Sequence, residues 1–166
     1  MAKHRRKLTQ TIDWSGPNRR EVFINSLIQK NKWTVGCEVG VRTGRTLFHL
    51  LDNNPELKMY AVDKDCSQFY NDDIKIKYGD RLVVLEDTSW LCAEQIKEKI
   101  DFVFIDAGHS TRNVTRDINA FRPLLKDDKG LLGHDIDFPA IQIALENLNT
   151  GFDAGPDNVW LFRLSN

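Results

Sequence analysis

No apolar run in this 166-residue sequence approaches the roughly 20 residues that a membrane-spanning helix needs. The chain also begins without the apolar segment of a secretory signal peptide. It has only three cysteines, Cys37, Cys66 and Cys92, and no Cys-x-x-Cys pair, so reduced thiols are the simplest interpretation. These absences predict a cytoplasmic protein that makes no use of a membrane.

The sequence has no excess of either charge and no repeated or low-complexity tract. Its formal net charge of -1 gives no overall sign of a nucleic-acid or membrane binder. With 41% apolar and 28% charged residues, it has the composition of an ordinary globular protein. We therefore predict one domain at residues 18–166, preceded by a basic tail at residues 1–17. The tail is either a solvated segment or a contact for an anionic substrate or nucleic acid.

The dinucleotide fingerprint Gly-x-Gly-x-x-Gly is missing. Residues 35–48 instead read as a buried strand, a tight turn with Gly40 and Gly44, and the start of a helix. The glycines would let the backbone approach a ligand, and the N–H groups at the helix start favour a carboxylate or phosphate. Glu38 would stand beside a cationic or hydroxyl-bearing group, so a zwitterionic amino-acid moiety fits better than a pyrophosphate. The alternative is an ordinary turn between a strand and a helix.

Strand-like and helix-like segments alternate along the rest of the chain. Strands are predicted at residues 35–39, 58–63, 81–86, 101–106, 131–135 and 159–164, and helices at residues 19–30, 45–51, 67–78, 90–99, 111–125 and 139–148. Residues 149–157 read as a loop with room for a short strand. This alternation predicts a doubly wound, largely parallel α/β sheet, with the first helix packed beside the ligand end as a partial lid.

An acidic residue stands at each of five predicted strand ends. They are Glu38, Asp63, Asp87, Asp106 and Asp135. In parallel sheets, ligands bind outside the carboxyl ends of the strands, so the whole series indicates a binding site rather than a purely structural role. Asp63 suits the two hydroxyls of a ribose. Asp87 would accept from an adenine amine or, with Thr88 and Ser89, cap the next helix.

Two motifs in the second half of the chain are more specific. They are Asp106-Ala107-Gly108-His109-Ser110 and Gly133-His134-Asp135, accompanied by Asp117 and Arg122-Pro123-Leu124-Leu125. The combination resembles class I S-adenosylmethionine (SAM) dependent methyltransferases of the methyltransferase family 24 type, which are similar to macrolide sugar O-methyltransferases and cephalosporin-hydroxylase-like proteins. The likeness covers about residues 35–164. It implies a three-layer Rossmann-like fold with a seven-stranded, mostly parallel sheet, ordered 3-2-1-4-5-7-6, whose last strand is antiparallel.

The resemblance also implies which residues hold SAM. The methionine part would lie at Glu38 and the Gly40 loop, and the ribose hydroxyls would meet Asp63. The adenine would lie beside Asp87 and Thr88. The full set of cofactor residues implied in this way is Glu38, Gly40, Thr43, Gly44, Asp63, Lys64, Asp87, Thr88 and Asp106.

Related enzymes place a divalent-metal site at the ends of the fourth and fifth strands. The resemblance implies Asp106, His134 and Asp135 as its ligands. His134 stands where metal-binding relatives often have an acid, which leaves open whether a metal binds and whether His134 is a ligand or a structural residue. Asp137 could serve as a substitute ligand. Oxygen ligands would favour Mg²⁺, and a histidine would admit Mn²⁺.

Asp106 and His109 are the predicted catalytic residues. A sulfonium methyl is already activated, so the protein has to align it with a nucleophile that loses a proton. His109 lies three residues past Asp106, where catechol-type relatives have a lysine, and is the candidate base. Otherwise it would be a loop histidine that bonds the backbone or caps the following helix.

Together these features predict a SAM-dependent O-methyltransferase that acts on a hydroxyl of a small molecule such as a sugar or polyol, with or without a divalent metal. Two alternatives are a SAM-binding module without transfer activity and a methyltransferase of nucleic acid or protein. A small domain with an open site could use a neighbouring subunit to cover its substrate, so a homo-oligomer is also expected.

Overall fold

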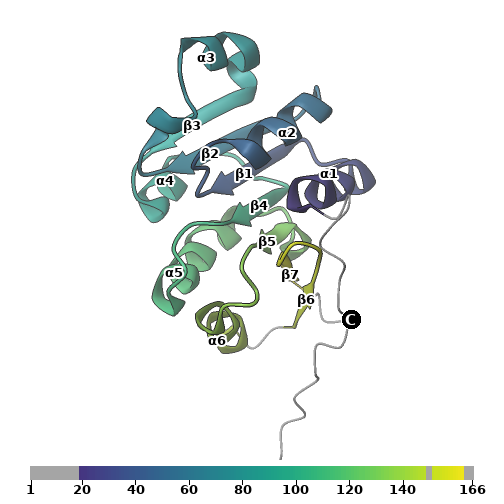
Figure 1. Ribbon diagram of the computed structural model, residues 1–166, viewed down its shortest axis with the longest axis vertical. Helices are drawn as coiled ribbons and strands as arrows, with labels where there is room; N and C mark the ends of the chain where they lie inside the picture. The colour runs from purple at the N-terminus through teal and green to yellow at the C-terminus, as the bar shows by residue number, and fades with distance from the viewer. Residues whose placement is uncertain (1–18, 149–150, 163–166) are drawn as a thin grey trace, which may run out of the picture.

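Seven strands form one sheet in the order β3-β2-β1-β4-β5-β7-β6 (Figure 1). This computed structural model describes residues 19–148 and 151–162. The strands are β1 (Val35–Val39), β2 (Lys58–Asp63), β3 (Leu82–Glu86), β4 (Phe102–Ile105), β5 (Leu131–Gly133), β6 (Phe152–Ala154) and β7 (Trp160–Phe162). β1 to β5 pair in parallel, whereas β7 is antiparallel to both of its neighbours. The strand order expected from the resemblance is therefore confirmed.

Helices cover both faces of the sheet and make a three-layer molecule (Figure 1). They are α1 (Arg20–Asn31), α2 (Arg45–Asn53), α3 (Asp72–Tyr78), α4 (Ser89–Gln95), α5 (Thr111–Phe121) and α6 (Pro139–Asn147). The core on one face takes side chains from α1, α2 and α3, and the core on the other takes them from α4, α5 and α6. In the described ranges, no helix combines the length and apolar character needed to cross a bilayer.

Both faces of the central strands are buried, which explains their continuous apolar runs. In β4, Phe102 and Phe104 join the core beside α1 and α2, while Val103 and Ile105 join the core beside α5. Successive side chains alternate in this way because a strand points them to opposite faces. Asp106, the next residue after β4, continues the series of Phe102 and Phe104 and so emerges on the face that α1 covers.

The three cysteines are free and buried in separate parts of the chain. Cys37 lies in β1, Cys92 lies in α4, and Cys66 begins a 3-10 turn after β2. Burial raises the pKa of the Cys66 thiol to about 12 and that of Cys92 to about 11, and it raises the pKa of Cys37 well above its usual range.

Three predicted helices end or begin elsewhere, for local reasons. The helix expected at residues 111–125 stops at Phe121 and passes into a 3-10 turn, because Pro123 cannot donate to a further helical hydrogen bond. The helix expected at 67–78 begins at Asp72, where the Asn71 side chain caps it by accepting from the N–H of Ile74 at 3.0 Å. The helix expected at 90–99 ends at Gln95 because the next residue is extended.

At the chain ends the comparison is incomplete. The short strand allowed for at residues 149–157 is β6, and the last predicted strand is β7, whose described part ends at Phe162. The predicted basic tail at residues 1–17 lies outside the described residues.

Candidate active site

A cavity of about 280 Å³ opens at the carboxyl ends of the parallel strands. Its wall includes five residues of the predicted cofactor set, Gly40, Asp63, Lys64, Asp87 and Asp106. Small-molecule sites usually have volumes of roughly 300–1,000 Å³, and this cavity lies near the lower end of that range. Of the remaining predicted residues, Glu38 and Gly44 are buried, Thr88 is partly buried and Thr43 is exposed, and none of the four is among the residues that line this cavity. Three of the five acids predicted at strand ends, Asp63, Asp87 and Asp106, thus line one groove.

The glycine loop after β1 is shaped by the protein itself. Gly40 has a φ of +90°, and a Cβ there would lie 2.3 Å from the carbonyl oxygen of Asp106. Gly44 has a φ of +79°, and a Cβ there would collide with the Phe48 ring. The N–H of Gly40 donates to the carbonyl of Val62 at 2.8 Å. Gly40 thus lets the loop pass the end of β4, and Gly44 leaves room for the Phe48 ring. Gly40 also lines the groove, and the ligand approach expected from the sequence stays a prediction.

Glu38 is a carboxylate enclosed by the core, with 2% of its surface exposed. It accepts from the backbone N–H of Leu47 in the first turn of α2, while its Oε2 has no hydrogen-bond partner. Burial, followed by the nearby charge of Asp106, raises its pKa well above the usual range, although Arg20 opposes this. An unpaired buried carboxylate oxygen is costly. It therefore suits a positively charged ligand group such as the ammonium of an amino acid.

Asp63 ends β2 and holds the loop that follows β1. Its Oδ2 accepts from the backbone N–H of Arg42 at 2.8 Å, and its Oδ1 accepts from that of Asp65 at 3.3 Å. A carboxylate has about four acceptor positions, so lone pairs remain for ligand hydroxyls. Asp63 therefore stays compatible with the ribose role that the sequence predicts.

Asp87, Thr88 and Ser89 do not cap α4 with their side chains. Thr88 stands at the cap position without a side-chain hydrogen bond, and its buried Oγ1 has no partner. Asp87 accepts from the backbone N–H of Thr88 at 2.6 Å. The Ser89 hydroxyl donates to the buried carboxylate of Asp117. After Glu38 Oε2, the Thr88 hydroxyl is the second buried side-chain oxygen without a hydrogen-bond partner among the predicted cofactor residues.

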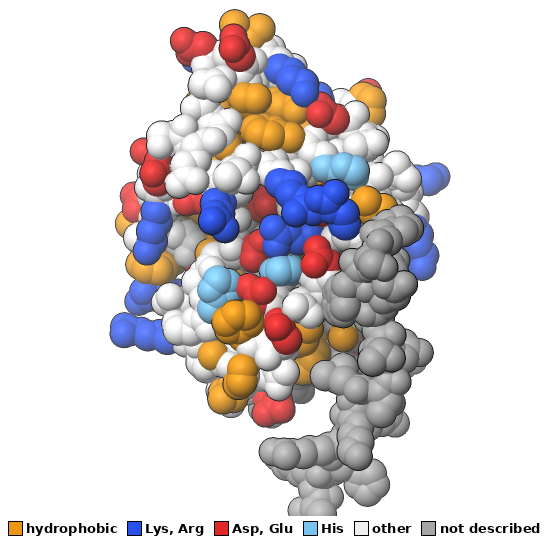
Figure 2. All heavy atoms as spheres, viewed as in Figure 1, with side chains coloured by type: hydrophobic (Ala, Val, Ile, Leu, Met, Phe, Trp, Pro, Cys, Tyr) orange, Lys and Arg blue, Asp and Glu red, His pale blue; other side chains and the backbone are white. Residues whose placement is uncertain are grey.

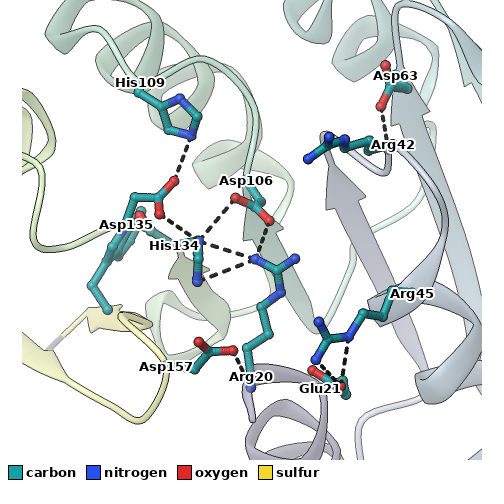
Figure 3. A network of polar contacts seen from close by, with 11 residues as sticks. Arg20, Glu21, Arg42, Arg45, Asp63, Asp106, His109, His134, Asp135 and Asp157 are labelled. Carbon is teal, nitrogen blue, oxygen red and sulfur yellow. Dashed lines mark hydrogen bonds and ion pairs between the residues drawn. The ribbon is translucent and has the colours of Figure 1, made fainter. Parts of the chain in front are cut away.

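A continuous series of polar contacts runs along the other side of Asp106 (Figure 3). His109 Nε2 lies 2.6 Å from Asp135 Oδ2, and Asp135 Oδ1 lies 2.9 Å from His134 Nδ1. That nitrogen is 3.3 Å from Asp106 Oδ1, and Asp106 Oδ2 is 2.9 Å from Arg20 Nη1. Figure 2 shows Lys and Arg side chains beside acidic and histidine side chains in the middle of this face.

His109 is half exposed and is held by two contacts. Besides the Asp135 pair, its ring stacks on Phe138 with centroids 5.2 Å apart. It does not cap α5, because the Ser110 side chain does so by accepting from the N–H of Asn113 at 3.2 Å. Because Nε2 is paired with the Asp135 carboxylate, Nδ1 is the ring nitrogen that can accept a proton.

His134 is fixed by both backbone and side chain. Its backbone N–H donates to Ile105, and its carbonyl accepts from the Trp160 indole N–H at 3.0 Å. Burial lowers the pKa of its imidazole, but the hydrogen bond to Asp106 and the charges of Asp106 and Asp135 outweigh this, so the pKa is raised. Gly133 is needed beside it, because a Cβ there would lie 2.1 Å from the Trp160 ring.

Asp106, His134 and Asp135 form the group of side chains predicted to bind a metal. One ligand atom from each lies within 4.8 Å of the others, and this is the group found in the described part of the chain. Asp137, the predicted substitute, is exposed and is not part of it. The group is already paired internally and with Arg20, so as arranged it leaves no ligand atom of Asp106 or His134 without a partner.

Arg20 was not among the residues predicted from the sequence. It lies in the first turn of α1, the helix that was expected beside the ligand end. The pattern placed the helix but could not show which of its side chains would reach the strand ends, because that depends on how α1 packs.

Comparisons with known proteins give the family and the fold of the chain. The family model described as a methyltransferase domain matches residues 37–136, which is more than half of the chain. A search of curated proteins finds no match.

Several solved structures share the fold at low sequence identity. The methyltransferase PaMTH1 from Podospora anserina was solved with bound S-adenosylhomocysteine (SAH). Its structure has a TM-score of 0.74 at 12% identity, and the match covers 89% of this chain and 78% of that one. CalS11, a TDP-rhamnose 3'-O-methyltransferase of calicheamicin biosynthesis, has a TM-score of 0.63 at 17% identity, covering 89% and 82%. The O-methyltransferase TomG from Streptomyces achromogenes, in complex with SAM, has a TM-score of 0.66 at 11% identity, covering 87% and 78%.

Proposed function

This chain belongs to the methyltransferase domain family, and we propose that it transfers the methyl group of SAM to a hydroxyl of a small molecule. One observation carries the proposal. Asp106 lines both the 280 Å³ groove of the predicted cofactor residues and a smaller adjoining cavity that His109, His134 and Asp135 also line. A methyl donor in the groove would thus face a basic side chain across one carboxylate.

The predicted cofactor residues fit SAM by their charge and by two unsatisfied buried oxygen atoms. Glu38 Oε2 would pair with the ammonium group, Asp63 would accept from the ribose hydroxyls, and Thr88 would meet the adenine side. SAM supplies a methyl group that is already activated as a sulfonium. Holding donor and acceptor in line can contribute about 7–11 kcal/mol to the lowering of the barrier.

His109 would remove the proton of the acceptor hydroxyl. With Nε2 donating to Asp135, Nδ1 keeps its lone pair and can take the proton, and Asp135 then stabilises the imidazolium. Phe138 fixes the ring plane by stacking. No step in this scheme passes through a metal ion, because Arg20 already pairs with Asp106 and His134.

The test combines binding with turnover. We expect SAM and SAH to bind in calorimetry, and SAH to accumulate when hydroxylated sugars and polyols are offered as acceptors. Binding without turnover of any hydroxylated acceptor would favour a SAM-binding module instead. Methylation of RNA or protein, lost on removing residues 1–7, would favour the macromolecular alternative. No binding of either SAM or SAH would contradict the proposal at its base.

A further inference from the structure

We propose that Arg20 is a positioning residue that holds the cation position of the Asp106–His134–Asp135 group, so that the chain works without a divalent metal there. The expected effect of Arg20 on catalysis rests on the proposed methyl transfer, but the expected effect on metal binding does not depend on it. It concerns a residue of α1 that neither the motifs nor the family match includes, since the match begins at residue 37.

The contacts of Arg20 coincide with the positions a metal ion would need. Its Nη1 lies 2.9 Å from Asp106 Oδ2, 3.2 Å from His134 Nδ1 and 3.3 Å from His134 Nε2. An ion held by the same carboxylate and imidazole would have to lie about 2.0–2.2 Å from its ligand atoms. The guanidinium and the ion therefore compete for the same ligands, and their like charges repel each other.

The backbone around Arg20 is anchored, so the guanidinium is not a loose surface group (Figure 3). The backbone N–H of Arg20 donates to Asp157 Oδ2 at 3.1 Å, in the connection before β7. The next residue, Glu21, accepts from Arg45 Nε at 3.1 Å and Nη2 at 2.9 Å, which ties α1 to α2. Ile24 and Ile28 then bury the helix in the core. Only 23% of the Arg20 side chain is exposed.

The position also explains how nearby carboxylates are tolerated. Asp106, Asp135 and the buried Glu38 all lie around the strand ends, and Arg20 acts electrostatically on Glu38 as well as pairing with Asp106. A divalent ion performs this neutralising task in many carboxylate sites. Here a side chain of the chain itself does so, and it orients Asp106 between the groove and His109.

The first experiment measures Mn²⁺ binding by the loss of the free-ion signal in electron paramagnetic resonance. We expect the wild-type protein to bind Mn²⁺ weakly, and Arg20→Ala to gain at least about tenfold in affinity because the ligand set is released. Adding Asp106→Asn to Arg20→Ala should abolish the gain. Arg19→Ala is the matched control, because it removes an equally charged neighbour that pairs with Glu21 instead.

Circular dichroism has to show that each variant is folded. A folded Arg20→Ala without any gain in Mn²⁺ affinity would overturn the proposal. So would a wild-type protein that binds Mn²⁺ as tightly as the variant does. Both results are independent of whether a methyl acceptor has been found.

The second experiment addresses catalysis. With an acceptor that is turned over, wild-type activity should be the same in EDTA and in Mg²⁺ or Mn²⁺. Arg20→Ala should lose activity in EDTA and recover part of it with Mn²⁺, a rescue that a purely structural role would not produce. EDTA-sensitive wild-type turnover would contradict the inference while leaving the proposed methyl transfer intact. Absence of turnover with every acceptor would contradict the proposed function and leave the binding experiment to decide the role of Arg20.

Discussion

His109 has one ring nitrogen paired with Asp135 and the other directed away from that pair. If it removes the acceptor proton, His109→Gln should lower kcat by about 10²–10⁴-fold while leaving SAM affinity unchanged. The measurement is SAH formation at saturating SAM, with calorimetry for binding. His49→Gln, on α2, is the matched control and should have no effect. A fully active His109→Gln would assign base catalysis to another group or to solvent.

Glu38 gives a pH-dependent prediction. Its folded-state pKa is raised, chiefly by burial, so the folded state holds a proton that the unfolded state releases above its ordinary value of 4.5. Stability contributed by this group is therefore full below that value and is lost as the pH rises toward the folded pKa. Each pKa unit of difference corresponds to about 1.4 kcal/mol.

Replacing Glu38 by Gln removes this titration. We expect the free energy of unfolding of Glu38→Gln to fall less than that of the wild type between about pH 5 and pH 8. Urea titrations at several pH values in this range measure the difference. The same variant should bind SAM more weakly, because Gln cannot release a proton to become the carboxylate that would pair with the ammonium. Parallel pH profiles for the two proteins would mean that Glu38 ionises normally in the folded chain.

At the level of single residues, three of the five acids predicted at strand ends line the groove. Asp63, Asp87 and Asp106 could be placed because each follows a strand whose apolar run is unmistakable, and parallel strands bring their ends to one edge. Arg20 could not be placed, since its reach depends on the tertiary packing of α1 against α2. The unsatisfied oxygen of Glu38 was equally invisible, because burial of one carboxylate atom is a property of the folded core.

Among the loops, the turn after β1 offers the sharpest test of backbone shape. Gly40→Ala should destabilise the protein by more than the roughly 1–3 kcal/mol of a strained backbone alone, because its Cβ would also strike the Asp106 carbonyl. Gly79→Ala is the matched control, with a positive φ of 53° and no atom within 4 Å of the added Cβ. Urea unfolding of both variants without cofactor measures the difference. Equal losses of unfolding free energy in the two variants would show that the backbone moves away from the Asp106 carbonyl without an energetic cost.

Most elements could be predicted from periodicity, while their ends could not. The alternation of apolar runs was enough for β1, β2 and β4, whose two faces are both buried. The early end of α5 depends on Pro123 and that of α4 on the extended residue that follows it. The antiparallel placement of β7 came from the family resemblance, because a three-residue strand carries no direction in its sequence pattern.

The molecule as a whole gives a ligand-linked prediction. A ligand that binds only the folded state at 100 times its Kd adds about 2.7 kcal/mol of stability. SAH should therefore raise the Tm, and Asp63→Asn should reduce that rise by removing the proposed ribose contact. Asp73→Asn, an exposed change on α3, should leave it intact. An equal SAH-induced rise in both variants would place the ribose elsewhere.

The three buried thiols have a practical consequence for chemical reactivity. Alkylating reagents attack the thiolate, and burial raises the pKa of each of these cysteines. Modification of the native protein therefore has to wait for a local opening. Since Cys37 lies in the central strand, Cys66 beside the β2 exit and Cys92 in α4, the three labelling rates would follow the opening of three different regions within one unmodified chain.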